Sequence, residues 1–174
     1  MIERRTFIAH VEDVPGVLNR IASLFRRRGF NIESLTVGKT DHDGISRMTI
    51  VARADDDVAR LIEANLYKLV NVLAVEEVTH HPSMIRDLAL IKVRATVETR
   101  PKILEATERY WARAIDEAPD AMTLEVAGTR DTIDELVETL RPFGIVEMVR
   151  TGVVAMTRGG GASGLGAVPS LETT

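Results

Sequence analysis

The sequence predicts an α+β protein built from two successive units of similar size, each with the element order βαββαβ. Three observations predict this fold class. Short segments alternate apolar and polar residues, which is typical of half-buried strands. Longer segments between them carry apolar residues at helical spacing. The strand and helix order runs once, meets the junction THHPSM and restarts, and this repeated order is that of the ferredoxin-like fold.

In the first unit, four segments have the character of strands: Thr6–Val11, Asn31–Gly38, Ser46–Ala52 and Val70–Thr79. A first helix is expected where Leu18, Ile21 and Phe25 recur on one face. Gly29 suits the left-handed position that often follows a helix. The second helix begins near the aspartates at 55–57, because negative charges favour a helix N-terminus.

The second unit repeats this order with different residues. Its expected strands are Leu88–Thr96, Ile115–Glu117, Met122–Gly128 and Ile145–Met156. Pro101 opens a helix whose predicted apolar side consists of Ile103, Ala106, Tyr110, Trp111 and Ala114. A last helix carries Ile133, Leu136, Val137 and Leu140. The expected domains are therefore residues 1–80 and 81–158, followed by a flexible, glycine-rich tail at 159–174.

The composition is that of an ordinary globular protein, with 45% hydrophobic and 28% charged residues among 174. A net charge of −4 argues against a broad nucleic-acid interface. The absence of cysteine excludes disulfides, thiolate metal sites and a cysteine nucleophile. The first residues, MIERRTFIAH, lack the apolar run of a signal peptide, and no segment has the length to span a bilayer. We therefore expect a cytoplasmic protein without membrane contact.

The stretch EDVPGVLNRIASLFRRRGFNIESL is the most informative one for function. A strand, an Asp-x-Pro-Gly turn and a helix follow one another, so the N–H groups near Gly16, Val17 and Leu18 lack intrahelical acceptors. Gly16 lets a ligand approach the backbone, and the helix dipole adds positive potential. These features predict a site for a carboxylate or phosphate, with Asp13 as counter-charge to a ligand ammonium. Alternatively, Asp13 and Pro15 only cap the helix.

No catalytic group of residues emerges from the rest of the sequence. Four histidines lack the spacing of known metal sites: His10, His42, His80 and His81. The carboxylates form no nucleophile pattern, and the C-terminal glycines lack the Gly-Lys-Ser/Thr of a phosphate loop. The run Arg26–Arg28 compensates the helix dipole or, as a second interpretation, contacts an acidic partner. We expect a non-catalytic binding module that holds no metal and no cofactor.

Several segments resemble the small regulatory subunit of acetohydroxyacid synthase (AHAS), also called acetolactate synthase. They are EDVPGVLNRIASLFRRRGFNIESLTVG, SRMTIV, LYKLVNVLAVEEV, LALIKVRA, LEVAGT and TGVVAMTRG. The similarity runs from about Thr6 to Gly159. RRGFNIESL followed by SRMTI is specific to this family, whereas the Asp-x-Pro-Gly helix start alone indicates the wider class of ACT domains.

The resemblance implies that the first unit is an ACT domain, two of which pair side by side in a homodimer. A branched-chain amino acid, usually valine, would bind at that interface. Its carboxylate would meet the amides of Gly16, Val17 and Leu18 and its ammonium Asp13, while Asn31 and Ile32 of the neighbouring chain close the site. Many relatives carry asparagine in place of Asp13, so affinity could differ here.

The resemblance also implies a catalytic partner, a separate large subunit that carries thiamine diphosphate, magnesium and FAD. That partner makes 2-acetolactate and 2-aceto-2-hydroxybutyrate in branched-chain amino-acid biosynthesis. The small subunit raises its activity and confers feedback inhibition. A stand-alone ACT-type sensor for another partner is the main alternative. An enzyme on a ferredoxin-like scaffold and a metal sensor are two further ones.

Overall fold

The structure, a computed structural model, describes residues 1–160. The chain divides into two compact units. The first comprises Met1–Met84 together with the returning segment 153–160, and the second comprises Ile85–Gly152. Residues 161–174, most of the expected tail, lie outside the described residues. None of the described helices is long and apolar enough to cross a membrane.

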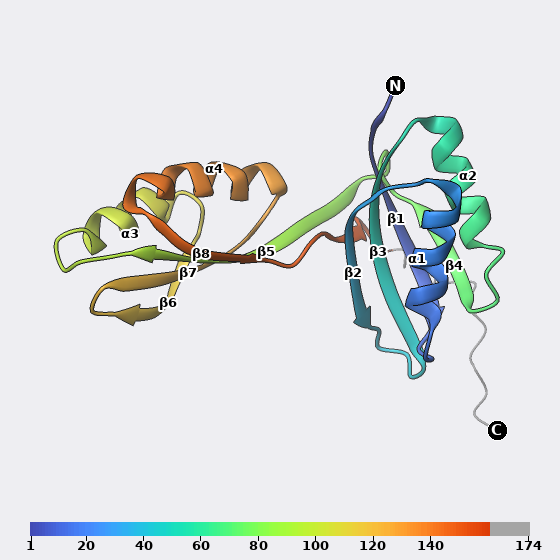
Figure 1. Ribbon diagram of the computed structural model, residues 1–174, viewed down its shortest axis with the longest axis horizontal. Helices are drawn as coiled ribbons and strands as arrows, with labels where there is room; N and C mark the ends of the chain where they lie inside the picture. The colour runs from blue at the N-terminus through green and yellow to red at the C-terminus, as the bar shows by residue number, and fades with distance from the viewer. Residues whose placement is uncertain (161–174) are drawn as a thin grey trace. The chain divides into compact units, whose positions relative to one another are not determined.

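The first unit has the predicted βαββαβ order (Figure 1). Its elements are β1 (Glu3–Glu12), α1 (Val17–Arg28), β2 (Ile32–Lys39), β3 (Ile45–Ala54), α2 (Asp56–Leu66) and β4 (Val72–Glu77). The strands form an antiparallel sheet in the order β2-β3-β1-β4, so β2 and β4 are its edges. Alternate residues of the central strands, such as Phe7 and Ile50, pack against Ile21, Phe25 and Ile62 of the helices. This core places α1 and α2 on one face of the sheet.

The second unit repeats the architecture. Its elements are β5 (Ser83–Arg94), α3 (Arg100–Glu108), β6 (Arg113–Ala118), β7 (Ala121–Gly128), α4 (Arg130–Leu140), a 3-10 turn (Arg141–Phe143) and β8 (Ile145–Arg150). The sheet order is β6-β7-β5-β8, and a short strand β9 (Val154–Thr157) also pairs with β5. Ile91, Leu124 and Leu136 lie at the centre of a separate core. The prediction of an α+β fold with two ferredoxin-like units is confirmed.

The predicted apolar side of the third helix is wrong beyond Glu108, where α3 ends. Trp111 has a left-handed backbone with a φ of 58° and is 90% exposed. Tyr110 is buried, and Ala114 belongs to β6, which pairs with β7. Apolar residues at helical spacing therefore continue past the end of the helix, because strand pairing overrides the local pattern.

The predicted last strand, Ile145–Met156, is two strands in the structure. Gly152, with a φ of 101°, turns the chain between β8 and β9. Beyond it, the N–H of Val153 donates to Ser34 Oγ at 3.0 Å, and the N–H of Arg158 donates to the Pro82 carbonyl at 2.7 Å. The chain thus returns to the first unit after Gly152, which the sequence did not indicate.

Candidate functional site

The start of α1 is built around Gly16. Its φ of 89° and ψ of −7° put it in the left-handed region, which glycine adopts without strain. A Cβ built there would meet nothing within 4 Å, so the space in front of this backbone is open. The first α-helical bond runs from the Arg20 N–H to the Gly16 carbonyl at 3.0 Å. The amides of Leu18 and Asn19 precede it and have no intrahelical acceptor.

The two helices of the first unit begin differently. At α2, the Asp55 carboxylate accepts from the Val58 N–H at 2.9 Å, and Asp56 and Asp57 occupy the first turn. At α1, no side chain caps the first turn and no acidic residue lies in it. No acidic residue in the first turn of α1 therefore compensates the positive end of its dipole, and this start of a helix would stabilise a bound anion.

Asp13 lies beside this turn without capping it. Its N–H donates to the carbonyl of Gly44 at 2.7 Å, while its carboxylate is exposed and makes no hydrogen bond or ion pair in residues 1–160. The interpretation that Asp13 only caps the helix is therefore wrong. Of the neighbouring candidates, Val17 points its side chain into the core at 4% exposure, whereas Leu18 is 46% exposed.

Within one chain, the structure does not bring Asn31 and Ile32 to this turn. They stand at the start of β2, after the end of α1, and a 12-residue helix spans about 18 Å. The bond from Asp13 to Gly44 instead places the α1 start beside the hairpin that follows Lys39 at the end of β2. Sequence reasoning missed Gly44 as a neighbour of the site, although its hairpin signal was visible.

One group of possible metal ligands is brought together in the first unit: Glu3, Asp56 and His80. The buried guanidinium of Arg5 lies among them. It donates to Glu3 Oε1 at 3.0 Å, to Asp56, and to His80 Nε2 at 2.7 Å. A cation already occupies the place that a metal ion would take, so these residues serve to hold Arg5.

His10 on β1 is buried, with 1% of its surface exposed, and Arg47 lies opposite it on β3. Burial, followed by the charges of Arg47 and His42, lowers the pKa of His10 from 6.5 to about 4. His10 is therefore neutral in the folded chain at pH 7.

Acidification is expected to destabilise the first unit through His10. The unfolded chain protonates it near pH 6.5 and the folded chain near pH 4, so stability falls as the pH drops between these values. From pH 7 to pH 5 the loss is about 2 kcal/mol. Urea unfolding at both pH values, followed through the NMR signals of β1, measures it. An equal pH dependence in His10→Asn, which cannot titrate at this position, would contradict this assignment.

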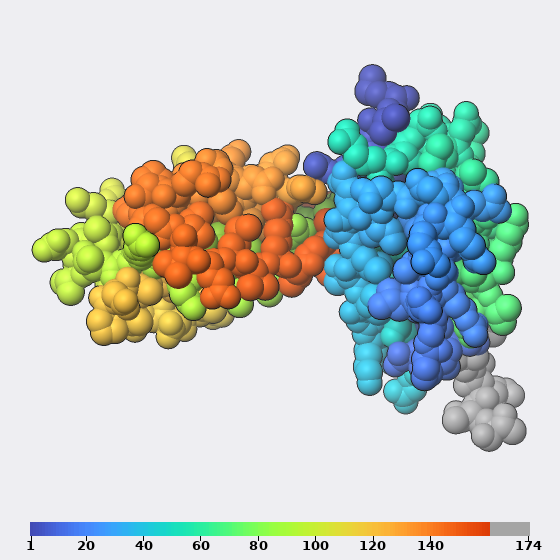
Figure 2. All heavy atoms as spheres, viewed as in Figure 1, coloured from blue at the N-terminus to red at the C-terminus, as the bar shows by residue number. Residues whose placement is uncertain are grey.

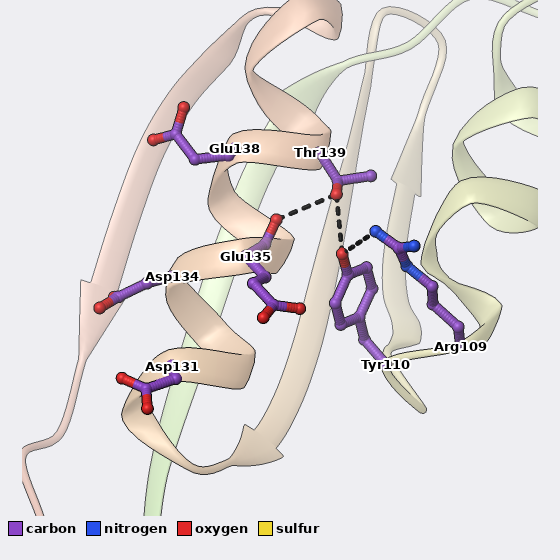
Figure 3. A pocket seen from close by; sticks show the side chains of 7 residues that line it. All are labelled: Arg109, Tyr110, Asp131, Asp134, Glu135, Glu138 and Thr139. Carbon is purple, nitrogen blue, oxygen red and sulfur yellow. Dashed lines mark hydrogen bonds between the residues drawn. The ribbon is translucent and has the colours of Figure 1, made fainter.

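The second unit carries a depression of about 720 Å³ along α4 (Figure 3). It is lined by Arg109, Tyr110, Asp131, Asp134, Glu135, Glu138 and Thr139. The Thr139 hydroxyl donates to the Glu135 carbonyl at 2.9 Å. Because its hydrogen is used in that bond, it accepts from the Tyr110 hydroxyl at 2.9 Å. The Tyr110 hydroxyl in turn accepts from the Arg109 guanidinium. These contacts join α4 to the turn after α3 and assemble no nucleophile with a base.

Tyr110→Phe is expected to lower the free energy of unfolding by about 1 kcal/mol, because it leaves Thr139 and Arg109 without their shared partner. The measurement is hydrogen exchange in the full chain, of the β5 amides for this variant and of the β1 amides for its control, because β1 pairs with the strand that holds Val75. Tyr67→Phe is the matched control, since the Tyr67 hydroxyl donates to the Val75 carbonyl at 2.8 Å from a half-exposed side chain. A larger loss of protection in Tyr67→Phe than in Tyr110→Phe would show that the buried chain of hydrogen bonds contributes little.

The class of protein follows from the first unit. Its βαββαβ fold and glycine-led helix start are those of an ACT domain, and residues 7–74 match the family described as the AHAS small subunit-like ACT domain. Residues 86–159 match the family described as the small subunit of acetolactate synthase. The chain belongs to the family of acetolactate synthase small subunits, as its resemblance predicted.

Individual relatives agree with this assignment. The chain is 47% identical over 156 residues to a probable acetolactate synthase small subunit of Archaeoglobus fulgidus, covering 90% of this chain and 98% of that one. It is 48% identical over 149 residues to the acetolactate synthase small subunit of Mycobacterium leprae, covering 86% and 88%. The crystal structure of the acetolactate synthase small subunit from Thermotoga maritima superimposes with a TM-score of 0.84 at 34% identity, covering 91% and 99%.

Proposed function

We propose that this chain is a non-catalytic regulatory subunit that activates a separate catalytic subunit of acetolactate synthase and makes it sensitive to a branched-chain amino acid. The observation that carries the proposal is the open, uncapped start of α1 in a member of the small-subunit family. The ligand carboxylate binds the amides of Leu18 and Asn19, which have no intrahelical acceptor, and the exposed Asp13 carboxylate binds its ammonium. Thiamine diphosphate, magnesium and FAD belong to the catalytic partner.

The effector site is completed by a second copy of the chain. β2 is an edge strand, and pairing of two β2 strands about a two-fold axis sets the start of one beside the end of the other. The end of β2 leads into the hairpin that contacts Asp13. This arrangement brings Asn31 and Ile32 of the partner subunit to the α1 start. Within one subunit, these two residues lie at the far end of α1 from Gly16.

Valine is the proposed effector, with the exposed Leu18 side chain beside its methyl groups. Leucine and isoleucine differ from valine by one methylene, which is worth about 1–3 kcal/mol. Because the effector contacts two subunits, its binding stabilises one arrangement of the dimer. That arrangement alters how the chain holds its catalytic partner, with a coupling free energy of about 1–3 kcal/mol.

Co-purification with the catalytic subunit tests this function. The two purified proteins are expected to elute together in size-exclusion chromatography, and the mixture to form acetolactate faster than the catalytic subunit alone. The chain alone, supplied with pyruvate and thiamine diphosphate, is expected to form none. Separate elution with unchanged activity would sink the proposal and favour a stand-alone ACT-type sensor.

A further inference from the structure

A groove of about 460 Å³ lies between α1 and α2 of the first unit. Leu24, Arg27 and Arg28 line it from α1, and Asn65, Lys68 and Leu69 line it from α2 and the turn that follows. Both helices lie on the same face of the sheet, and the outer surface of α1 faces the viewer in Figure 2. The volume of the groove lies in the range of about 300–1,000 Å³ that is typical of small-molecule sites.

Three cations surround this groove, and none of them pairs with a carboxylate of residues 1–160. In the described part of the chain, Arg27, Arg28 and Lys68 make no ion pair and no side-chain hydrogen bond. Other arginines, such as Arg141 and Arg150, are paired with carboxylates. Positive charges held together around one concave surface repel each other, and an anion between them removes that repulsion.

Compensation of the helix dipole accounts for only part of the arrangement. The arginines in the last turn of α1 lie where the dipole favours cations, although the carbonyls of Arg26 and Phe25 already accept from the N–H groups of Gly29 and Phe30 at 3.2 and 2.9 Å. Lys68 belongs to the turn after the other helix, so it does not serve the α1 dipole.

The floor of the groove is polar at one buried point. Asn65 is 3% exposed, and its Nδ2 donates one N–H to the Leu61 carbonyl at 2.6 Å. That bond uses one of the two N–H groups, so the amide has a second donor to offer a ligand. Leu24, at 6% exposure, and Leu69 supply apolar surface beside it. A ligand that reaches Asn65 must enter the groove, which favours a small molecule over a flat protein surface.

We propose that this groove binds a small phosphorylated anion, at a site distinct from the effector site at the start of α1. Arginine recognises phosphate oxygens through paired N–H groups, and lysine adds a point charge. Arg27 and Arg28 hold the phosphate from one side and Lys68 from the other, while Asn65 and the two leucines contact the rest of the molecule. This inference does not depend on the proposed regulation of a catalytic subunit.

Titration of the full chain with inorganic pyrophosphate, followed by NMR, tests the site. We expect saturable shifts in the signals of Asn65, Lys68 and the end of α1, and at least tenfold weaker binding in the double variant Arg27→Gln/Arg28→Gln. Arg26→Gln is the matched control, because Arg26 stands in the same last turn but does not line the groove. Its affinity is expected to stay within twofold of the wild type.

Three results would overturn the proposal. Equal weakening in Arg26→Gln and the double variant would mean general attraction to a basic helix end. Equal binding of sulfate and pyrophosphate would mean that the groove does not recognise phosphate groups. The third is the absence of pyrophosphate binding. If the double variant Arg27→Glu/Arg28→Glu then also fails to associate with the catalytic subunit, the groove is a contact for an acidic protein surface and not a small-molecule site. Circular dichroism of each variant verifies that it is folded.

Discussion

Gly16→Asp is expected to raise the valine concentration needed for half-inhibition of the reconstituted synthase by at least tenfold. The added carboxylate lies where the effector carboxylate is proposed to bind, and the open space in front of Gly16 accommodates the side chain without displacing its neighbours. Two negative charges about 5 Å apart near a protein surface repel by more than the 1.4 kcal/mol that corresponds to tenfold. Inhibition curves of the two holoenzymes measure the effect.

Two control variants separate charge from backbone strain. Gly16→Asn has nearly the same shape and the same left-handed backbone requirement as Gly16→Asp, without the charge, so it is expected to weaken inhibition less. Gly159→Asn imposes a similar strain away from the effector site, at a glycine whose φ is 95° and whose added Cβ would meet nothing within 4 Å, and is expected to leave inhibition unchanged. Unaltered inhibition in Gly16→Asp, with basal activation retained, would show that the effector binds elsewhere.

Arg150→Met is expected to lower the stability of the second unit by about 3 kcal/mol, the lower end of the range for breaking a buried ion pair. Arg150 Nε donates to Asp87 Oδ2 at 2.6 Å, and its Nη1 donates to Asp134 at 2.7 Å. Asp87 is 5% exposed, so the substitution leaves a buried carboxylate without its cation. Methionine keeps most of the length of the side chain. Hydrogen exchange of the β5 and β7 amides measures the change.

The double variant Asp87→Asn/Arg150→Met tests whether the unpaired Asp87 carboxylate causes the loss of stability. With the buried charge removed, stability is expected to recover by at least about 1 kcal/mol relative to Arg150→Met. A double variant less stable than the single one would mean that Arg150 acts through packing or through Asp134 instead of through Asp87.

Most of the fold could be predicted from the sequence, because the local patterns agree with the tertiary structure in most elements. Alternation in Thr6–Val11 and the helical spacing of Ile21 and Phe25 both describe surfaces that face one core, whereas Leu18, expected on the same side, is exposed. The pattern failed after Glu108, where Tyr110 is buried but lies beyond the helix. It also failed at Gly152, because a positive φ at a glycine within an apolar run cannot be read from periodicity.

The candidate site could be predicted only in part. The Asp-x-Pro-Gly turn indicated the free amides, but the sequence left open whether Asp13 caps the helix, which depends on the path of the backbone past Gly44. The anion groove was not visible, since Asn65 and Lys68 join the arginine run only when α1 and α2 pack side by side. Charge patterning along one helix does not show which residues of another helix complete a surface.

The central claim, that this chain makes a separate catalytic subunit sensitive to a branched-chain amino acid, is tested most directly by one titration. Acetolactate formation by the catalytic subunit is measured against valine concentration, with and without the chain. The prediction is a higher rate with the chain and a saturable fall of that rate on adding valine, which the catalytic subunit alone does not show. The same response to valine with and without the chain would contradict the claim.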